Sequence, residues 1–180
     1  MKTLIINGGT IEDAFALSYI ERVKPDCILA ADRGMEFCYR NQIKPDVILG
    51  DYDSADKTIL EAFRRKSGIE WHQYQPEKDY TDSEIAIGKA MERNSSEIHI
   101  LGGTGTRLDH VLGNIQLLMQ PLAKDIPCFL IDSHNRIRLL KARTILQKSQ
   151  QFGKYVSLLP LTTEVTGVTL TGMKYPLQDA

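Results

Sequence analysis

The chain has 180 residues, of which 42% are hydrophobic and 25% charged, and its net charge at neutral pH is -1. This composition is typical of a globular protein with its own core, and the small charge gives no field for non-specific nucleic-acid binding. No apolar run approaches the ~18 residues of a transmembrane helix, so we expect neither a nucleic-acid partner nor membrane insertion. Three widely spaced cysteines form no disulfide or zinc pattern, which predicts a cytoplasmic protein.

Strand and helix signals alternate along the first two-thirds of the chain. Short apolar runs predict strands at residues 3–6, 27–31, 47–49, 69–74 and 98–101. Apolar residues at helical spacing predict helices at residues 12–23, 34–40, 55–66, 82–93 and 108–122, the last with Leu112, Ile115 and Leu118 or Met119 inward. The fold class is therefore α/β, a mostly parallel sheet with flanking helices, and ligands are expected at the carboxyl ends of its strands.

After about residue 126 the pattern changes to short apolar or β-branched runs separated by small polar residues, glycine and proline. It predicts an all-β region with strands at residues 128–131, 136–140, 144–146, 155–159 and 165–171. We divide the chain into an α/β domain at residues 1–130 and a smaller, sandwich-like β domain at residues 131–180. A domain with so few short strands is only marginally stable by itself. We therefore expect this domain to be incomplete or to be completed by another chain.

Two aspartates directly follow the third predicted strand, in the segment Gly50, Asp51, Tyr52, Asp53 and Ser54. Because side chains alternate along a strand, Asp51 and Asp53 are expected on the same side, where their charges repel. A proton, a basic side chain or a hard cation such as Mg²⁺ must neutralise them. The alternative interpretation is a turn in which Asp53 and Ser54 cap the next helix.

The segment before the fourth helix contains two more carboxylates. Thr81 and Glu84 match a capping box, with Thr81 as the N-cap residue. Asp82 could complement the helix dipole alone, whereas Asp79 lies before the cap and is freer to turn toward a ligand. Lys78 is suited to contact phosphate as a point charge.

A glycine-rich segment, residues 102–105, separates the fifth strand from the next helix. Glycines there let backbone N–H groups approach an anion, although a plain tight turn explains them equally well. The segment matches neither a Walker loop nor Gly-x-Gly-x-x-Gly. Arg107 could bind phosphate in bidentate fashion, and His110 is interpreted as a core histidine in preference to a general base.

The segment Asp32, Arg33 and Gly34 follows the second strand. An aspartate there can accept a hydrogen bond from a ribose or bind metal, and Gly34 permits a sharp turn; capping is the alternative. The four motifs together supply carboxylates, a glycine loop and the cations Arg33, Lys78 and Arg107. This set is suited to metal-assisted transfer of a phosphoryl-type group.

These motifs, in this order, resemble those of the thiamine pyrophosphokinase family. They are ADRG at 31–34, GDYDS at 50–54, KDYTDSE at 78–84, GGTGTRLDH at 102–110, LGN at 112–114, and the C-terminal segments 157–161 and 166–177. The resemblance implies transfer of diphosphate from ATP to the hydroxyethyl group of thiamine, giving AMP and thiamine diphosphate with Mg²⁺. It also implies a homodimer with a catalytic α/β domain, a C-terminal β-sandwich and thiamine near the subunit interface.

The resemblance also implies roles for individual residues. Asp51, Asp53 and Asp79 correspond to metal-binding carboxylates, with Asp82 as a weaker fourth, and Arg107 joins the first three as catalytic. The residues expected to contact ATP are Asp32, Arg33, Gly34, Ser54, Lys78, Thr81, Gly103, Thr104, Asp109, His110 and Asn114. Family members usually continue past a segment similar to residues 172–177. We therefore expect weaker binding of thiamine, whereas the metal and phosphate site is expected to be unaffected.

Two other functions fit parts of this pattern. The Asp51-x-Asp53 spacing also occurs in metal-dependent glycosyltransferases that use nucleotide-sugars. A non-catalytic protein that binds a nucleotide or thiamine is the third possibility. Thiamine-dependent AMP formation separates the leading hypothesis from both.

Overall fold

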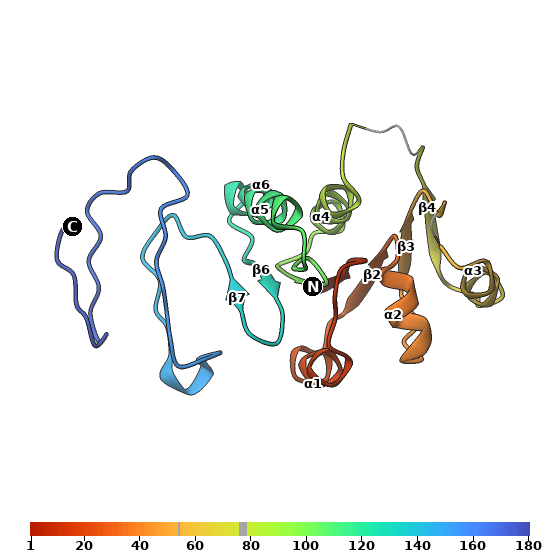
Figure 1. Cartoon of the computed structure of the whole chain (residues 1–180), viewed down its shortest axis with the longest axis horizontal. Coiled ribbons are helices and arrows are strands. Elements are labelled where there is room, and N and C mark those ends of the chain that lie inside the picture. Colours follow the sequence, from red (N-terminus) through yellow and green to blue (C-terminus); the bar gives the residue numbers. More distant parts are fainter. Residues whose placement is uncertain (54, 76–78) are drawn as a thin grey trace.

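The computed structural model describes residues 1–53, 55–75 and 79–180, and one sheet forms its centre (Figure 1). The strands are β1 (Lys2–Ile6), β2 (Cys27–Ala31), β3 (Val47–Gly50), β4 (Glu70–Gln73), β5 (Glu97–Leu101), β6 (Cys128–Ile131) and β7 (Arg136–Ile137). They lie in the order β4-β3-β2-β1-β5-β6-β7, and all neighbours are parallel except β6 and β7. The predicted mostly parallel sheet is confirmed.

Helices cover both faces of this sheet, as predicted. On one face lie α1 (Asp13–Val23), α2 (Gly34–Arg40) and α3 (Lys57–Arg64). On the other face lie α4 (Asp82–Glu92), α5 (Leu108–Leu117) and α6 (Met119–Ala123).

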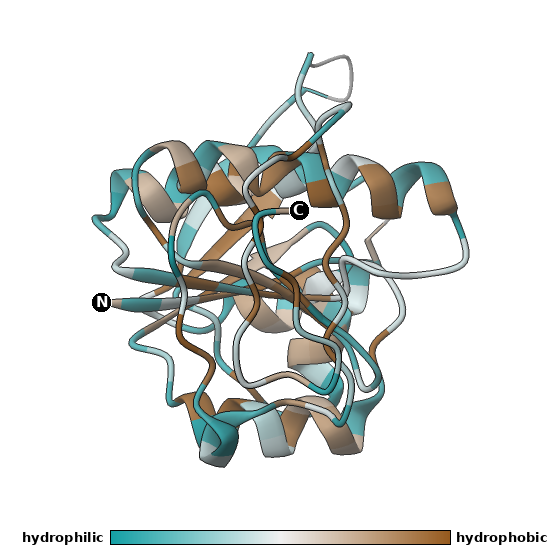
Figure 2. Ribbon diagram, turned by 90° about the vertical axis from the view of Figure 1, so that its left-hand side faces the viewer, coloured by the Kyte–Doolittle hydropathy of each residue, from teal (hydrophilic) through white to brown (hydrophobic). Residues whose placement is uncertain are grey.

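The core is divided by the sheet because side chains alternate along each strand. Leu4 and Ile6 of β1 pack in the cluster that contains Phe37 and Phe63, whereas Ile5 packs in the other cluster. Figure 2 shows the hydrophobic strands between the two helical layers. Both faces of the strands are therefore apolar, which is why these runs are nearly continuous in the sequence.

Side chains cap the first turns of α3 and α4. The Asp56 carboxylate accepts hydrogen bonds from the N–H of Thr58 (2.7 Å) and of Ile59 (3.4 Å). The Thr81 hydroxyl accepts one from the N–H of Glu84 (3.2 Å), as the sequence predicts. In a capping box the Glu84 carboxylate would accept a hydrogen bond from the N–H of Thr81. Here the Glu84 carboxylate accepts one from the Gln120 carboxamide (2.8 Å).

The helix predicted at residues 108–122 is divided at Leu118 into α5 and α6. Pro121 lacks the N–H that a continuous helix would donate to the carbonyl of Leu117, which favours this break. Leu118 is buried as expected, but Leu112 is 61% exposed, so the prediction that it points inward was wrong.

The C-terminal part of the chain contains less regular structure than predicted. The strand predicted at 128–131 forms, and the one predicted at 136–140 forms only over 136–137; both extend the first sheet instead of starting a second one. Among the described residues after Ile137, the regular features are a short 3₁₀ helix, η1 (Lys148–Gln150), and one bridge between Leu170 and Leu177. The strands predicted at 144–146 and 155–159 were wrong, and the one predicted at 165–171 is reduced to the bridge at Leu170, because such short runs need a paired neighbour to become strands. The division at residue 131 stays a prediction.

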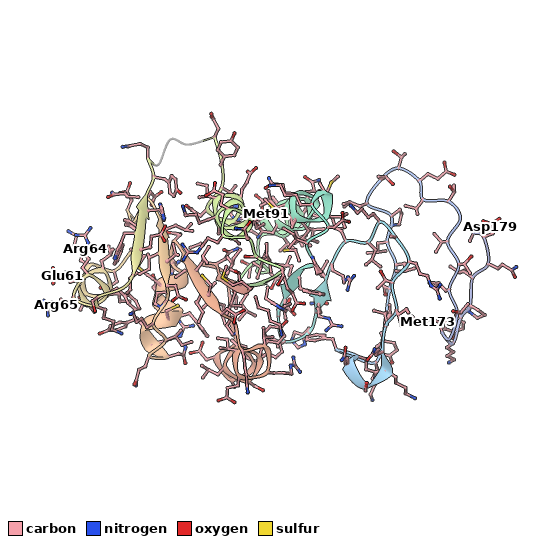
Figure 3. All side chains as sticks on the ribbon, turned by 180° about the vertical axis from the view of Figure 1, so that it is seen from behind. Glu61, Arg64, Arg65, Met91, Met173 and Asp179 are labelled. Carbon is pink, nitrogen blue, oxygen red and sulfur yellow. The ribbon has the colours of Figure 1, made fainter. Side chains whose placement is uncertain are left out.

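The C-terminal segment lies beyond β7, at the end of the molecule opposite α3. Figure 3 shows Arg64, Glu61 and Arg65 at the α3 end and Asp179 at the other end. This segment exposes large apolar side chains, including Tyr155 (92% exposed) and Leu159 (86%). In the part of the chain that the structure describes, no helix has both the length and the apolar character needed to cross a membrane.

A buried polar cluster joins α1 to β5. Nδ1 of His99 lies 2.7 Å from the Tyr19 hydroxyl, and Nε2 lies 2.7 Å from the Glu97 carboxylate. The imidazole also stacks on Phe129. Burial lowers the pKa of His99, although its hydrogen bond to the Glu97 carboxylate acts in the opposite direction.

We predict that this cluster loses stability on acidification. The folded protein resists protonation of His99, so the unfolded state binds more protons once the pH falls below about 6.5. The contribution of His99 to the free energy of unfolding is complete above that pH and falls by at most about 1.4 kcal/mol per pH unit below it. Urea unfolding of the wild type, His99→Gln and exposed His134→Gln between about pH 7.5 and about pH 5.5 measures this. Only His99→Gln should flatten the slope; equal slopes in all three proteins would contradict the assignment.

Candidate functional site

The candidate site lies at the carboxyl edge of the sheet, where strand order changes direction between β1 and β5. In open α/β sheets this point is where ligands bind. The segments after β1 and β5 approach each other closely there: the N–H of Gly9 donates to the carbonyl of Gly102 (3.0 Å), and that of Asn7 to Leu101 (2.9 Å). A Cβ added at Gly9 would lie 2.3 Å from the Gly102 oxygen, so this approach requires glycine.

The glycine-rich segment after β5 is fixed from both sides. Gly102 has a φ of 70°, in the left-handed region that glycine adopts readily. Gly103 is buried, and its carbonyl accepts a hydrogen bond from the Asn114 carboxamide on α5 (2.7 Å). Thr104 is half-buried and hydrogen-bonds the carboxylate of Asp132, which follows β6. Gly103, Thr104 and Asn114, predicted together from the sequence, are brought together here.

Asp132 joins this edge although the sequence analysis did not assign it. Burial raises its pKa, but hydrogen bonds from the backbone N–H of His134, from Asn135 and from Thr104 bring the pKa below its ordinary value. In the sequence Asp132 directly follows an apolar run, and the same pattern indicated Asp32 and Asp51. This pattern could have identified Asp132 as a site residue.

A second unassigned residue, Asn7, links β1 to the start of α4. Its carboxamide nitrogen donates to the Ser83 hydroxyl in the first turn of α4 (2.8 Å). Asn7 is 6% exposed, and its Oδ1 has no hydrogen-bond partner among the described residues. The contact places the helix N-terminus, with Thr81 and Asp82, beside the carboxyl end of β1. A polar residue between an apolar strand and two glycines could have indicated this.

The strand β3 ends at Gly50, before both aspartates of the Asp51-x-Asp53 pair. The argument from strand alternation was therefore wrong, because Tyr52 between them has a φ of 64°. Asp51 is half-buried and Asp53 is exposed, and the N–H of Asp53 donates to the Asp51 carboxylate (3.0 Å). The two carboxylates thus share a local turn beyond the strand.

The four predicted metal ligands are not assembled into a closed site. Asp79 is exposed and Asp82 half-buried, near the start of α4. In the described residues, no group of three or more His, Cys, Asp or Glu side chains is placed to hold a metal ion. Carboxylates are nevertheless the ligands that Mg²⁺ prefers, so the donor set fits this ion chemically. Ser54 and Lys78, both predicted to contact ATP, lie outside the described residues.

The segment after β2 is also at this edge. Asp32 is half-buried with a φ of 49°, an uncommon conformation for a residue other than glycine. The Arg33 guanidinium pairs with Glu36 one turn further along (3.0 Å). Gly34 is needed for close packing and not for a special φ, since a Cβ there would lie 1.9 Å from the Ile6 oxygen.

Arg107 and Asp109 form an exposed ion pair at the start of α5 (2.6 Å), with 66% and 64% of their side chains exposed. The hydrogen bond from Arg107 lowers the pKa of Asp109. His110 is 64% exposed, so its interpretation as a core histidine was wrong. His110 lies in α5, a helix in which no side chain is classed as buried among the described residues.

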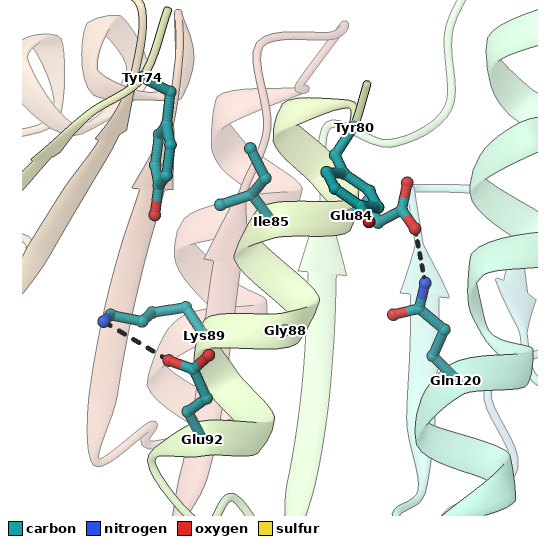
Figure 4. Close-up of a pocket in the computed structure, with 8 residues that line it drawn as sticks. All are labelled: Tyr74, Tyr80, Glu84, Ile85, Gly88, Lys89, Glu92 and Gln120. Atoms are coloured by element: carbon teal, nitrogen blue, oxygen red, sulfur yellow. Dashed lines mark hydrogen bonds and ion pairs between the residues drawn. The ribbon is translucent and has the colours of Figure 1, made fainter. Parts of the chain in front are cut away.

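A cavity of about 350 Å³ runs along α4, lined by Tyr74, Tyr80, Glu84, Ile85, Gly88, Lys89, Glu92 and Gln120. Figure 4 shows the Glu84–Gln120 hydrogen bond and, further along α4, the Lys89–Glu92 ion pair (3.6 Å). Tyr80 follows Asp79, so one end of the cavity begins beside the candidate site. Of the described residues, none that the sequence analysis assigned to the site lines this cavity.

Comparison with known proteins gives a consistent picture. A family model for "Thiamin pyrophosphokinase, catalytic domain" matches residues 22–130, and one for "Thiamin pyrophosphokinase, vitamin B1 binding domain" matches residues 143–180. The chain is 36% identical over 154 residues to a thiamine pyrophosphokinase of Bacillus subtilis, covering 84% of this chain and 70% of that protein. It is 30% identical over 152 residues to thiamine pyrophosphokinase 2 of Arabidopsis thaliana, covering 79% of this chain and 56% of that protein.

Solved structures agree with these matches. The crystal structure of a thiamine pyrophosphokinase from Bacillus subtilis superposes with a TM-score of 0.86 at 31% identity, covering 100% of this chain and 83% of that one. That of a thiamin pyrophosphokinase from Geobacillus thermodenitrificans gives 0.81 at 29% identity, covering 100% and 82%.

We predict that Asn114 stabilises the glycine-rich segment through its bond to Gly103. Replacing Asn114 by Leu keeps the side-chain size but leaves the buried Gly103 carbonyl unpaired, at a cost of about 1–3 kcal/mol. Gln116→Leu also replaces a carboxamide side chain by leucine, but at an exposed position of α5, and should change stability by less than about 0.5 kcal/mol. Denaturant unfolding of both variants measures the difference, and equal losses would contradict this role.

Proposed function

The chain belongs to the thiamin pyrophosphokinase family, and we propose that it transfers diphosphate from ATP to thiamine in the presence of Mg²⁺. The observation that carries the proposal is the family match over residues 22–130, which includes the loops after β2, β3 and β5. The hydroxyl oxygen of thiamine forms a bond to the β-phosphorus of ATP. The bond from that phosphorus to the oxygen it shares with the α-phosphorus breaks, AMP leaves with the electron pair, and the hydroxyl proton is released to water.

The carboxylates Asp51, Asp53, Asp79 and Asp82 are the proposed holders of Mg²⁺. Bound there, the ion would offset negative charge on the phosphate oxygens. Asp51 and Asp53 share one turn, in which the backbone N–H of Asp53 donates to the Asp51 carboxylate (3.0 Å). Asp79 and Asp82 lie at the start of α4, which the Asn7–Ser83 hydrogen bond ties to the sheet edge.

The backbone supplies the proposed phosphate contacts. We propose that N–H groups in the segment of Gly103 and Thr104 and at the start of α4 contact the phosphates, because free backbone N–H groups of this kind bind anions. Arg33 and Arg107 are held by Glu36 and Asp109 on the surface. Exposed ion pairs contribute only about 0–1 kcal/mol, so a polyphosphate can displace either carboxylate at little cost.

The C-terminal part is proposed to bind thiamine next to a partner subunit. Residues 143–180 match the vitamin B1 binding model, and they expose apolar side chains such as Ile145, Tyr155 and Tyr175. In a homodimer a second chain would cover part of this surface and remove it from water. The protein is proposed to act in the cytoplasm, in line with its unpaired cysteines.

The direct test is incubation with ATP and Mg²⁺, with and without thiamine, followed by separation of the nucleotides. Thiamine-dependent AMP is the expected product. ADP as product would contradict diphosphate transfer, and sugar release from a nucleotide-sugar would support a glycosyltransferase. Saturable binding of ATP or thiamine without AMP would indicate a binding protein.

We predict that Asp51→Asn and Asp53→Asn each lower the rate of AMP formation by at least about 100-fold, or about 2.7 kcal/mol. Each change removes a charge from the proposed ion site with little change of shape. Asp56→Asn is the matched control, because it removes a neighbouring carboxylate but keeps a side chain able to cap α3. Near-normal rates in either of the first two variants would contradict the assignment of these aspartates.

A further inference from the structure

Tyr52 lies between the two proposed metal-binding aspartates, but its side chain belongs to the core. It is 8% exposed and packs in the cluster on the α1–α3 face of the sheet. Its ring meets Trp71 of β4 edge to face, with centroids 5.7 Å apart. The chain therefore places a buried aromatic anchor between Asp51 and Asp53.

The backbone at Tyr52 has a conformation that bulky residues avoid. Its φ is 64°, and a residue held in the left-handed region costs roughly 1 kcal/mol or more. Such a conformation persists only where surrounding contacts impose it. The turn closes at once, because the carbonyl of Tyr52 accepts a hydrogen bond from the N–H of Ala55 (3.2 Å).

The Tyr52 hydroxyl is the contact that fixes this turn to the sheet. The hydroxyl lies within hydrogen-bonding distance of two backbone carbonyl acceptors, that of Ile48 in β3 (3.1 Å) and that of His72 in β4 (2.9 Å). The side chain thus ties the loop after β3 to the two strands at the edge of the sheet.

Packing and the hydroxyl act together on this ring. Tyr52 borders a cavity of about 480 Å³ together with Arg64, Trp71 and Gln73, so the ring is not enclosed on every side. Packing holds the ring in the core, whereas the two contacts of the hydroxyl fix its direction relative to β3 and β4.

We infer that Tyr52 is a positioning residue for the metal-binding carboxylates: its hydroxyl holds the left-handed turn that directs Asp51 and Asp53 outward while the ring points inward. This inference rests on the proposed function in so far as these carboxylates bind a divalent cation. Groups that orient metal ligands typically change metal affinity about 10–100-fold when removed.

The test compares Tyr52→Phe with Tyr19→Phe. Tyr19 is also buried and loses one hydroxyl contact, that with His99, but it lies on α1 away from the loop after β3. Binding of Mn²⁺, an oxygen-preferring probe, is followed by electron paramagnetic resonance without nucleotide. Unfolding of both variants and the Mg²⁺ dependence of AMP formation are measured in parallel.

Both variants should lose a similar amount of stability, about 1 kcal/mol. Tyr52→Phe should also weaken Mn²⁺ binding about tenfold and raise the Mg²⁺ concentration for half-maximal rate by a similar factor. Tyr19→Phe should leave both within about twofold. Unchanged Mn²⁺ affinity in Tyr52→Phe, or a wild type that binds no Mn²⁺, would overturn the inference. A wild type that binds Mn²⁺ through Tyr52-dependent carboxylates but forms no AMP would overturn the proposed function alone.

Discussion

The close packing of backbone at the carboxyl end of β1 is the constraint on which the candidate site depends. A Cβ at Gly34 would lie 1.9 Å from the carbonyl oxygen of Ile6, and one at Gly102 would lie 2.4 Å from that of Asn7. The segments after β2 and β5 can reach β1 only because these positions lack side chains. Three loops that are far apart in the sequence therefore meet at one edge.

The edge is built mainly from backbone, and the charged side chains around it are held more loosely. Asn114 and Asp132 anchor the glycine-rich segment from α5 and from the end of β6. The guanidinium groups of Arg33 and Arg107 instead pair with acidic residues in the first turn of the helices that follow them. Such pairs contribute little to stability, so a phosphate ligand can replace them. A rigid backbone site with exchangeable cations suits the binding and release of a polyphosphate.

Tyr52 and Asn7 connect the core to this edge in different ways. The Tyr52 hydroxyl reaches carbonyls of β3 and β4, whereas the Asn7 carboxamide reaches the first turn of α4. Each side chain is buried, and each holds a segment that carries proposed metal ligands. The contact between Asn7 and Ser83 leaves Oδ1 of Asn7 without a hydrogen-bond partner among the described residues, so one buried acceptor at the candidate site is unsatisfied.

Local patterns in the sequence determined the alternating strands and helices and the Thr81 cap, because each depends on neighbours within one or two turns. The ordered motifs also indicated the family. The tertiary structure decided what depends on distant contacts: β6 and β7 extend the first sheet, His110 is exposed, and Tyr52 turns inward between Asp51 and Asp53. Periodicity describes which way a side chain points within one element. It does not encode which element lies next to it, and that neighbour decides burial, hydrogen bonding and the shape of the site.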